Sequence, residues 1–403
     1  MAITIIGEPM PFWPICNNVE WFFESTNTGQ ANFSFTVEVY INGGLNSTHQ
    51  VFPENGDAGK FNISALGRAV LTNNFPDQGI FGQELLTDYQ WNLIIYERYG
   101  TPAEVQVASA ETTSSFRFLN GSFRYENIIT GNWDYQDYDL DTGGKGDLFL
   151  TDFPRNKKDI VAYSDAKYLS IINSGADNCT GYVNLYNITG TLITSATWIG
   201  ALGTNLRIPL VSVGPRMLVS STSLVASDFD NCYYYTIQIK QTATPSKDSE
   251  LYRIYYDQSC SPYARKTLHW LNKYGAWDSF TFSLLSEDSS DVTSNRYSKR
   301  IGQWIDNSYQ YDLTDGQQMT VSKNVQDKLI LNSDWIHEEV QQWLVRDLYE
   351  SPRVYLQGNL ILDIFEPVNV TNNNYVLKQR RKAGLIQEQV QIDRTYTYTS
   401  QLG

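Results

Sequence analysis

The sequence is poor in the residues on which metal and nucleophile chemistry usually depends. Among 403 residues there are three histidines and four cysteines. The histidines lie in unrelated segments, at His49, His269 and His337, and form no H-x-H or H-x-x-x-H pair. The cysteines are widely spaced, at Cys16, Cys179, Cys232 and Cys260. Without a C-x-x-C pair they form no metal-ligand pattern, so a histidine- or cysteine-based metal site is not predicted.

Long apolar runs are also missing. No stretch approaches the roughly 18–20 apolar residues that a membrane-spanning helix needs. The opening "MAITIIGEPMPFWPIC" has no basic region followed by a continuous apolar segment, so no secretion signal is predicted. The cysteines are accordingly expected to be free thiols in a reducing cytosol.

Motifs for cofactor and covalent chemistry are absent. Neither a G-x-G-x-x-G nor a P-loop occurs, and no cofactor is predicted. Cys260 and His269 fall near one predicted hairpin, but no nucleophile elbow or oxyanion-hole turn accompanies them. The sequence therefore predicts a protein that is not an enzyme.

Positive charge is scarce. Charged residues make up 18% of the chain and the formal net charge is −14, which disfavours binding to a phosphate backbone as the main task. The one basic cluster is "KQRRK", 378–382. It could touch DNA or an acidic partner, but a solvated loop is the preferred interpretation.

Aromatic and apolar residues, in contrast, are plentiful. The chain has 27 Tyr, 18 Phe and 10 Trp, and 41% of its residues are hydrophobic. This composition predicts a folded, mainly β protein. Four regions are expected from the turn signals and composition: an immunoglobulin-like β-sandwich over 1–110, an extended arm or long loop over 111–160, a second β-domain over 161–245, and a β-hairpin plus helix-containing α+β domain over 246–403.

Alternation identifies the clearest strands of the first region. In "NFSFTVEVYINGG" the side chains of Phe33, Phe35, Val37 and Val39 are predicted to share a buried face, followed by a turn at residues 42–44. "WNLIIYERYG", 91–100, is a second strand. The segment "NISALGRAVLTNN" fits either a short helix or a strand.

One helix is predicted, over 334–350 in "SDWIHEEVQQWLVRDLYESP". Apolar residues recur along one stripe at Ile336, Val340, Trp343, Leu344 and Leu348. Ser333 or Asp334 is expected to cap its start, and Ser351-Pro352 to end it.

The stretch "LHWLNKYGAWDSFTFSL", 268–284, predicts a β-hairpin with an aromatic face. Phe280, Phe282 and Leu284 alternate with polar residues, as in a strand with one buried side. Gly275 is expected in the turn with a positive φ.

An acidic string, "DYQDYDLDTGGKGD", is the best candidate for a metal site. Asp137, Asp139 and Asp141 have the one, three and five spacing of a calcium loop. Thr142 stands where such loops have glycine, and Leu148 where they have glutamate. A surface acidic turn is therefore the preferred interpretation.

Aromatic side chains suggest two kinds of binding surface. Sugar stacking could involve Tyr233–Tyr235, Trp133 with Tyr135 and Tyr138, or Trp270 with Trp277, although core packing is the default in strands. The 111–160 arm is predicted to form an interface with a neighbouring subunit, because its composition is unsuited to a core of its own. The predicted interface residues are Phe116, Phe118, Phe123, Tyr125, Trp133 and Tyr135.

Three segments carry a resemblance to a known group of proteins. "WFFESTNTGQANFSFTVEVYINGG", "YDQSCSPYARKTLHWLNKYGAWDSFTFSL" and "WLVRDLYESPRVYL" resemble virion proteins from phages of Bacteroidetes, including crAss-like bacteriophages. The resemblance covers the start of the chain and about 250–356, and is weak over 110–245. These are packing motifs rather than catalytic signatures.

The resemblance implies a structural component of the phage tail or neck, forming a ring-shaped homo-oligomer below the portal. Its partners would be copies of itself and other tail, neck or portal proteins, with no membrane contact and with DNA met only within the tail lumen. It would be assembled in the host bacterial cytoplasm and reside in the virion. The alternative is a carbohydrate-binding or glycan-cleaving receptor-binding tail component.

Overall fold

A computed structural model shows a mainly β protein. It describes residues 3–54, 58–71, 75, 81–84, 89–101, 104–129, 133–140, 147–175, 178–198, 207–242, 247–259, 262–311, 314, 316–358, 365–372, 376–377 and 385–399. Side chains are not described for 81–84, 104–109, 125 and 129. The chain divides into two compact units, one formed by Met1–Gln258 with Leu271–Asp278, the other by Ser259–Trp270 with Ser279–Gly403. Each unit is described by itself.

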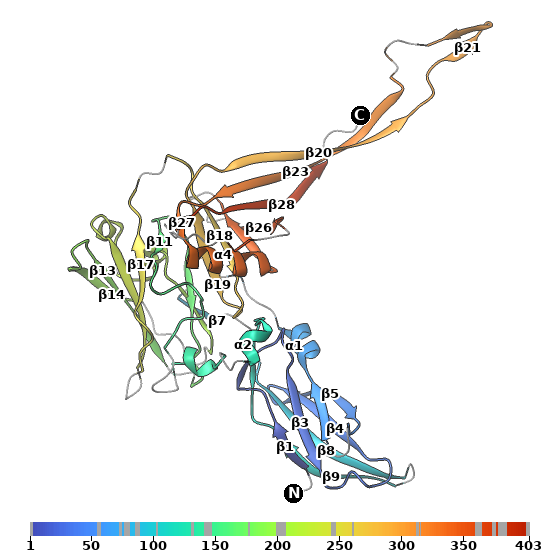
Figure 1. The fold of residues 1–403 in the computed structure, drawn as a ribbon, viewed down its shortest axis with the longest axis vertical. Helices are drawn as coiled ribbons and strands as arrows, with labels where there is room; N and C mark the ends of the chain where they lie inside the picture. The colour runs from blue at the N-terminus through green and yellow to red at the C-terminus, as the bar shows by residue number, and fades with distance from the viewer. Residues whose placement is uncertain are drawn as a thin grey trace. The chain divides into compact units, whose positions relative to one another are not determined.

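The first hydrophobic core of unit 1 lies in an N-terminal sandwich-like region (Figure 1). One sheet has the order β5 (Gly44–Val51), β4 (Ser34–Ile41), β8 (Trp91–Thr101), β9 (Glu104–Thr112). The other has the order β1 (Ile3–Gly7), β3 (Glu20–Ser25), β6 (Ala58–Asn62). A parallel pair, β2 (Phe12–Pro14) with β10 (Arg117–Leu119), and helix α1 (Ser64–Val70) complete the region.

The predicted alternation in this region is confirmed. Phe35, Val37 and Val39 are fully buried, and Phe33 is 7% exposed. Asn42 and Gly43 both have positive φ, as the tight turn between β4 and β5 requires. The undecided segment forms a helix, α1. The immunoglobulin-like topology stays a prediction.

The second core of unit 1 lies under a five-stranded sheet. Its order is β11 (Asp159–Val161), β17 (Tyr252–Tyr256), β16 (Tyr234–Gln241), β13 (Cys179–Tyr186), β14 (Leu192–Thr197). A second sheet has the order β12 (Tyr168–Ser170), β15 (Pro209–Ser212), β7 (Phe81–Glu84). Helices α2 (Tyr125–Ile129) and α3 (Pro215–Ser221) and the 3-10 turns η1 (Tyr135–Tyr138) and η2 (Ala226–Phe229) also belong to unit 1.

Unit 2 is built on a seven-stranded sheet. Its order is β19 (Trp277–Phe282), β18 (Lys266–Leu271), β25 (Val354–Gln357), β26 (Phe365–Val370), β28 (Gln389–Thr399), β23 (Gln318–Asn332), β20 (Glu287–Ser298). Strand β24 (Ile336–His337) pairs with β27 (Leu385–Ile386), and helix α4 (Glu338–Glu350) follows β24. The first two residues of β19 and the last of β18 are counted with unit 1.

Helix α4 corrects the predicted helix start. The stripe of Val340, Trp343, Leu344 and Leu348 is buried as predicted, but the helix begins at Glu338 rather than 334. Its N-cap is His337, without a side-chain cap. The preceding residues stay extended because Ile336 and His337 form the ladder with β27.

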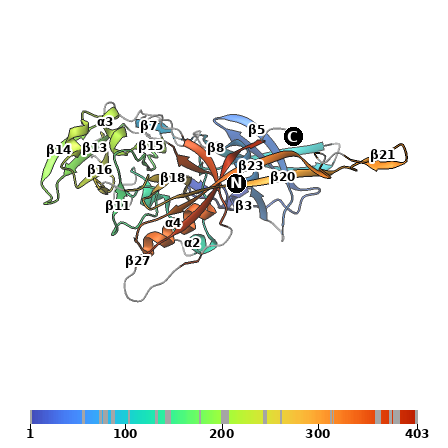
Figure 2. The ribbon, with the colours of Figure 1, turned by 90° about the horizontal axis from the view of Figure 1, so that it is seen from above.

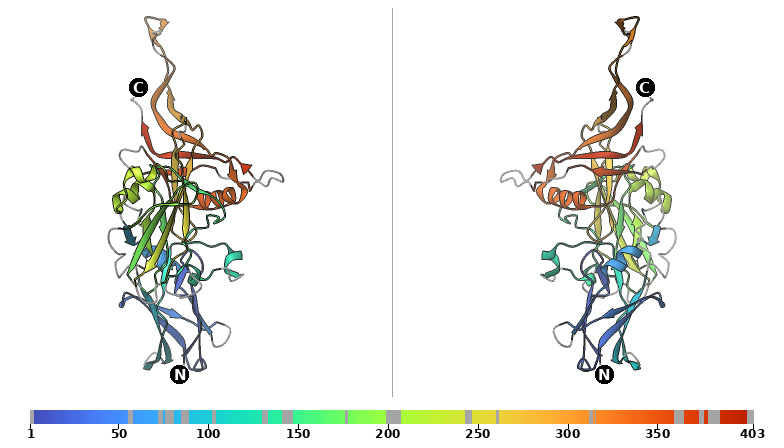
Figure 3. Two further views of the ribbon diagram at one scale, coloured as in Figure 1. Left: turned by 90° about the vertical axis from the view of Figure 1, so that its left-hand side faces the viewer. Right: turned by 90° about the vertical axis from the view of Figure 1, so that its right-hand side faces the viewer.

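A narrow ribbon extends from the body of unit 2 (Figures 1 and 3). It consists of β20 and β23, which pair from Glu287–Ile330 to Ser298–Gln318 with a register shift between Asn295 and Arg296. Beyond them lies a small hairpin of β21 (Gln303–Ile305) and β22 (Ser308–Gln310), which Figure 2 shows at the far end of the ribbon. We call residues 287–332 the ribbon and 302–311 its tip.

Candidate functional site

The turn of the 268–284 hairpin is a rigid structural element. Gly275 has φ +80°, which confirms the predicted turn. The Asn272 side-chain carbonyl accepts hydrogen bonds from the backbone N–H groups of Tyr274 and Ala276, both 3.0 Å long. The backbone N–H of Ser122 donates to the Lys273 carbonyl across 2.9 Å. The turn is therefore fixed from within and by a distant segment of the same unit.

Tyr274 lies in a buried aromatic cluster. Its ring centroid is 5.3 Å from that of Phe123, 5.8 Å from Trp133 and 5.1 Å from Tyr138. The Tyr274 hydroxyl donates to the Asp152 carboxylate and lies 2.8 Å from the Tyr138 hydroxyl. Burial raises the pKa of Tyr138 to about 12 and that of Tyr274 well above its usual value. Both phenols stay neutral near pH 7, so neither is a nucleophile or a base there.

Asp278 is the one buried carboxyl group of the turn with a clearly perturbed titration. Burial raises its pKa to about 6, against the opposing effect of hydrogen bonds from Asn272 and Thr151. Those bonds reach its Oδ2 from the Asn272 amide at 3.1 Å and the Thr151 hydroxyl at 3.0 Å. A raised carboxyl pKa is one mark of a catalytic acid. Here both partners are structural groups and the carboxyl is 6% exposed, so a packing role explains it.

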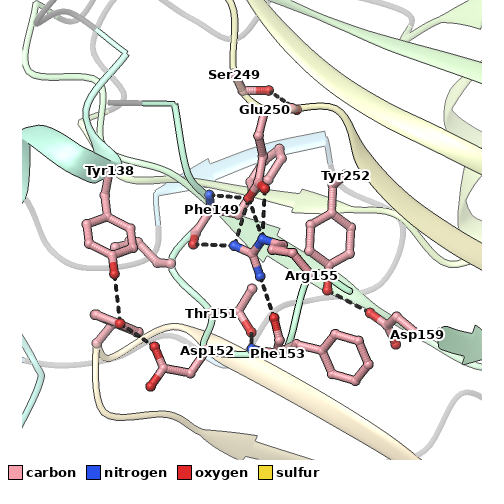
Figure 4. Close-up of polar contacts among 12 residues, drawn as sticks. Tyr138, Phe149, Thr151, Asp152, Phe153, Arg155, Asp159, Ser249, Glu250 and Tyr252 are labelled. Carbon is pink, nitrogen blue, oxygen red and sulfur yellow. Dashed lines mark hydrogen bonds and ion pairs between the residues drawn. The ribbon is translucent and has the colours of Figure 1, made fainter. Parts of the chain in front are cut away.

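A second polar cluster surrounds Arg155 (Figure 4). The guanidinium Nε lies 2.7 Å from Glu250 Oε2, and Nη1 donates to the Phe153 carbonyl across 2.8 Å. Glu250 Oε1 accepts from the backbone N–H of Phe149 at 2.9 Å. The Arg155 guanidinium also stacks over Tyr252 at 5.0 Å. This cluster ties residues 149–155 to the strand that begins at Tyr252.

A buried ion pair completes the network. Lys167 Nζ lies 2.8 Å from Asp159 Oδ2, and both residues are about 95% buried. The Tyr252 hydroxyl donates to the same carboxylate oxygen across 2.8 Å. The carboxylate is therefore neutralised and hydrogen-bonded, as a buried charge must be.

The side chains of these polar clusters of unit 1 pair with one another and with backbone groups. Each one is closed by partners from its own chain. In the part of the chain that the structure describes, no group of three or more His, Cys, Asp or Glu side chains could hold a metal ion. Nor does any described helix have the length and apolar character needed to cross a membrane.

The structure does not support the calcium-loop hypothesis at Asp137 and Asp139. Asp137 lies in the 3-10 turn η1. Asp139 is fully buried, and its carboxylate accepts from the backbone N–H of Ser174 at 3.0 Å and its hydroxyl at 2.6 Å. Asp141 lies outside the described residues, as do Cys260 and the basic cluster 378–382. Asp139 therefore serves the fold.

The predicted interface residues of 111–160 require a correction. Phe116, Phe118, Phe123 and Trp133 are at most 5% exposed, so they pack inside their own chain rather than against a neighbour. The Tyr135 ring lies 5.7 Å from that of Phe12. The Tyr125 side chain is outside the described part.

The reason is that long-range partners supply the missing core. Phe116 and Phe118 belong to the N-terminal core, whereas Leu140 and Phe149 belong to the second core. The backbone N–H of Leu140 donates to the Ile172 carbonyl across 2.9 Å. The segment thus joins the two cores of unit 1 instead of forming a free arm.

Sugar stacking on the predicted tryptophans is excluded by burial. Trp133, Trp270 and Trp277 are 4%, 0% and 2% exposed. Tyr235 is fully buried, whereas Tyr233 and Tyr234 remain partly exposed on the five-stranded sheet.

The ribbon is the feature that the sequence reasoning missed. Its exposed large apolar side chains are Val292, Tyr297, Trp304, Ile305, Tyr309, Tyr311, Met319 and Val321. At the tip, Trp304 pairs with Tyr309 across the hairpin, and their rings are 5.7 Å apart. The Trp304 side chain is 74% exposed. A run of apolar groups left in water along a projecting element is typical of an interface.

The tip has a defined conformation. Asp306 and Asn307 have φ of 49° and 63°, as a two-residue turn between right-twisted strands requires. The Tyr309 ring lies over Gly302, and its hydroxyl donates to the Ile301 carbonyl. The aromatic side of the tip is therefore ordered before any partner binds.

No known family model matches the chain, and no curated protein matches it.

Proposed function

We propose that the chain is a structural subunit of a bacteriophage tail or neck. Copies of it form a ring below the portal and join neighbouring virion proteins. The observation that carries this proposal is the ribbon, a long projecting element with exposed apolar side chains. The resemblance of three sequence segments to virion proteins of crAss-like and related phages supplies the biological setting.

The reach of the ribbon supports contact with another subunit. The twelve residues of β20 span about 40 Å at the usual rise of ~3.3 Å per residue. A compact domain of 100 residues has a radius of gyration of about 13 Å. An arm of this length is comparable to the diameter of such a domain, so it can reach across the body of a neighbouring one.

The chemistry of the ribbon supports the same use. Strand β20 is the last strand of its sheet, so its outer edge offers backbone groups for pairing with another chain. The exposed pairs Tyr297–Met319 and Trp304–Tyr309 offer apolar surface along the same element. An isolated monomer gains little from either feature, whereas an assembly buries both.

Electron microscopy of the purified chain tests the proposal. Closed rings of one size are expected. A double variant, Trp304→Ser with Tyr309→Ser, should lose the rings while its far-ultraviolet circular dichroism is unchanged. Gln303→Ser with Gln310→Ser is the matched control, because these two residues are cross-strand partners at the adjacent position of the same hairpin.

Two results would overturn the proposal. One is a protein that stays monomeric at all accessible concentrations and is missing from purified phage particles. The other is a ring that forms equally well with both double variants, which would show that the tip of the ribbon is not part of the interface between subunits.

A further inference from the structure

A row of apolar side chains crosses the whole five-stranded sheet of unit 1 on its outer face. The register places five residues side by side, one from each strand, in the order Ile160, Tyr255, Tyr234, Tyr186, Leu192. Their neighbours along the strands, including Val161, Ile254, Tyr235 and Leu185, are buried in the core. Since side chains alternate along a strand, the row lies on the opposite, outer face.

The row is accessible and ordered. Ile160 and Leu192 at its two ends are 52% and 50% exposed, and the three tyrosines between them are partly exposed. The rings of Tyr186 and Tyr234 stack with centroids 4.9 Å apart and planes 14° apart. The Tyr234 and Tyr255 centroids are 5.9 Å apart.

Cations lie on this platform. The Arg253 guanidinium is 4.7 Å from the Tyr234 ring centroid, and Lys158 Nζ is 5.0 Å from that of Tyr255. Lys158 also donates to the Tyr233 hydroxyl across 2.8 Å. In these contacts the partners of both cations are aromatic rings and a hydroxyl group. Because these partners carry no negative charge, they do not neutralise the cations.

The rest of the outer face is polar, and its charged side chains on the central strands are cations. The partly or fully exposed positions on this face of β13, β16 and β17 are Thr180, Tyr182, Asn184, Tyr186, Tyr234, Gln238, Lys240, Arg253 and Tyr255, whereas Thr236 on the same face is buried. None of them is a carboxylate, although the whole chain has a net charge of −14. Lys240 at one end pairs with Asp248 at 2.8 Å. The face is thus less negative than the net charge of the whole chain would suggest.

We infer that the tyrosine row binds an acidic polysaccharide. The apolar faces of sugar rings pack on aromatic rings, and a row of three tyrosines accommodates successive sugars of one chain. The side-chain amide of Asn184, two residues from Tyr186 on the same face of β13, matches sugar hydroxyls. Arg253 and Lys158 match the carboxylate groups of an acidic sugar by charge.

The observations favour a polysaccharide over a nucleic acid. A nucleic acid carries one phosphate per nucleotide, and its binding relies on many cations. The platform offers two cations over its rings, in a chain whose overall charge repels a dense polyanion. An acidic polysaccharide such as hyaluronan, with one carboxylate in each disaccharide, combines fewer charges with many hydroxyl groups. This inference is independent of the ring assembly, because the ribbon contributes nothing to the row.

Isothermal titration calorimetry on the full chain tests the binding of an acidic polysaccharide to the row. The ligands are polygalacturonate, hyaluronan, neutral dextran and oligothymidylate. Binding to at least one acidic polysaccharide and none to dextran is expected. Tyr234→Ala should weaken that binding by about tenfold or more, since one stacking ring is lost. Tyr234→Phe should restore it, and Arg253→Gln should weaken it. Phe52→Ala, which removes an aromatic side chain that is 64% exposed and lies outside both the row and the ribbon, is the control and should bind like the unchanged protein.

Several results would overturn the inference. Absence of binding to both acidic polysaccharides is one, and equal binding of dextran is another. Oligothymidylate as the tighter ligand would assign the row to single-stranded nucleic acid. An equal loss in Tyr234→Ala and Phe52→Ala would show that the row is not the site. Thermal melting of each variant separates these results from misfolding, and Tyr255→Ala provides a second test of the row.

Discussion

Gly275 lies directly against the backbone of Asn120. A methyl group on Gly275 would be 2.8 Å from both the carbonyl carbon and the carbonyl oxygen of Asn120. Gly275 also has a φ of +80°, a backbone conformation that is unfavourable for residues other than glycine. Two independent constraints therefore act at one residue of the turn.

Gly275→Ala should lower the free energy of unfolding by more than the ~1 kcal/mol expected from positive φ alone. Gly190→Ala is the matched control, since Gly190 has φ +78° but its nearest neighbour, the Tyr234 hydroxyl, is 3.8 Å from the added methyl. Urea unfolding of both variants measures the difference. Equal losses would mean that the close approach to Asn120 has no energetic cost.

Trp343 should be a major contributor to the stability of unit 2. Its side chain is 6% exposed, and its ring lies 5.2 Å from that of Trp270. Trp343→Ala should cost about 3–5 kcal/mol of unfolding free energy by leaving a large cavity. Trp335→Ala, at a position 53% exposed, should cost much less. Thermal denaturation compares them, and similar melting temperatures for the two variants would contradict the described core.

Asp278 should make the stability depend on pH in an unusual direction. Its pKa rises from 3.8 to about 6 because burial disfavours the charged form. The folded state therefore holds a proton that the unfolded state has lost between about pH 4 and 6. By linkage, this group lowers stability as pH rises through that window.

Asp278→Asn isolates the effect. Relative to the unchanged protein, the variant should gain stability as pH rises from about 4 to 7, by up to roughly 3 kcal/mol for a shift of about two pKa units. Guanidinium unfolding at several pH values measures the difference in unfolding free energy between the two proteins. Contributions from the other carboxyl groups cancel in this difference. Parallel stability curves for the two proteins would show that Asp278 titrates normally.

Local pattern predicted the parts of the fold that depend on local physics. Alternation located the buried face of β4, and the glycine in "KYGA" located the positive-φ turn at Gly275. The apolar stripe of α4 was also predicted from the sequence. The first residue of the helix was not, because the residues before Glu338 pair with β27, a partner distant in sequence.

Long-range packing explains the larger errors. The glycines and aspartates of 111–160 suggested an arm, but Phe123 packs on Tyr274 and Asp139 binds Ser174. The true projecting element was missed because β20, "EDSSDVTSNRYS", has few apolar residues and no buried face. A strand of that composition is stabilised by pairing with β23, which no local pattern reveals.

Removal of the tip tests the central claim, assembly through the ribbon, most directly. Ser298 and Gln318 are cross-strand partners, so replacing 299–317 with Asn-Gly closes a shortened ribbon in the same register. Light scattering coupled to size exclusion should give a single oligomeric mass for the full chain and the monomer mass for the shortened one, and a cooperative thermal transition should show that the shortened chain is folded. An unchanged oligomer after the deletion, or a monomeric full chain, would contradict the account.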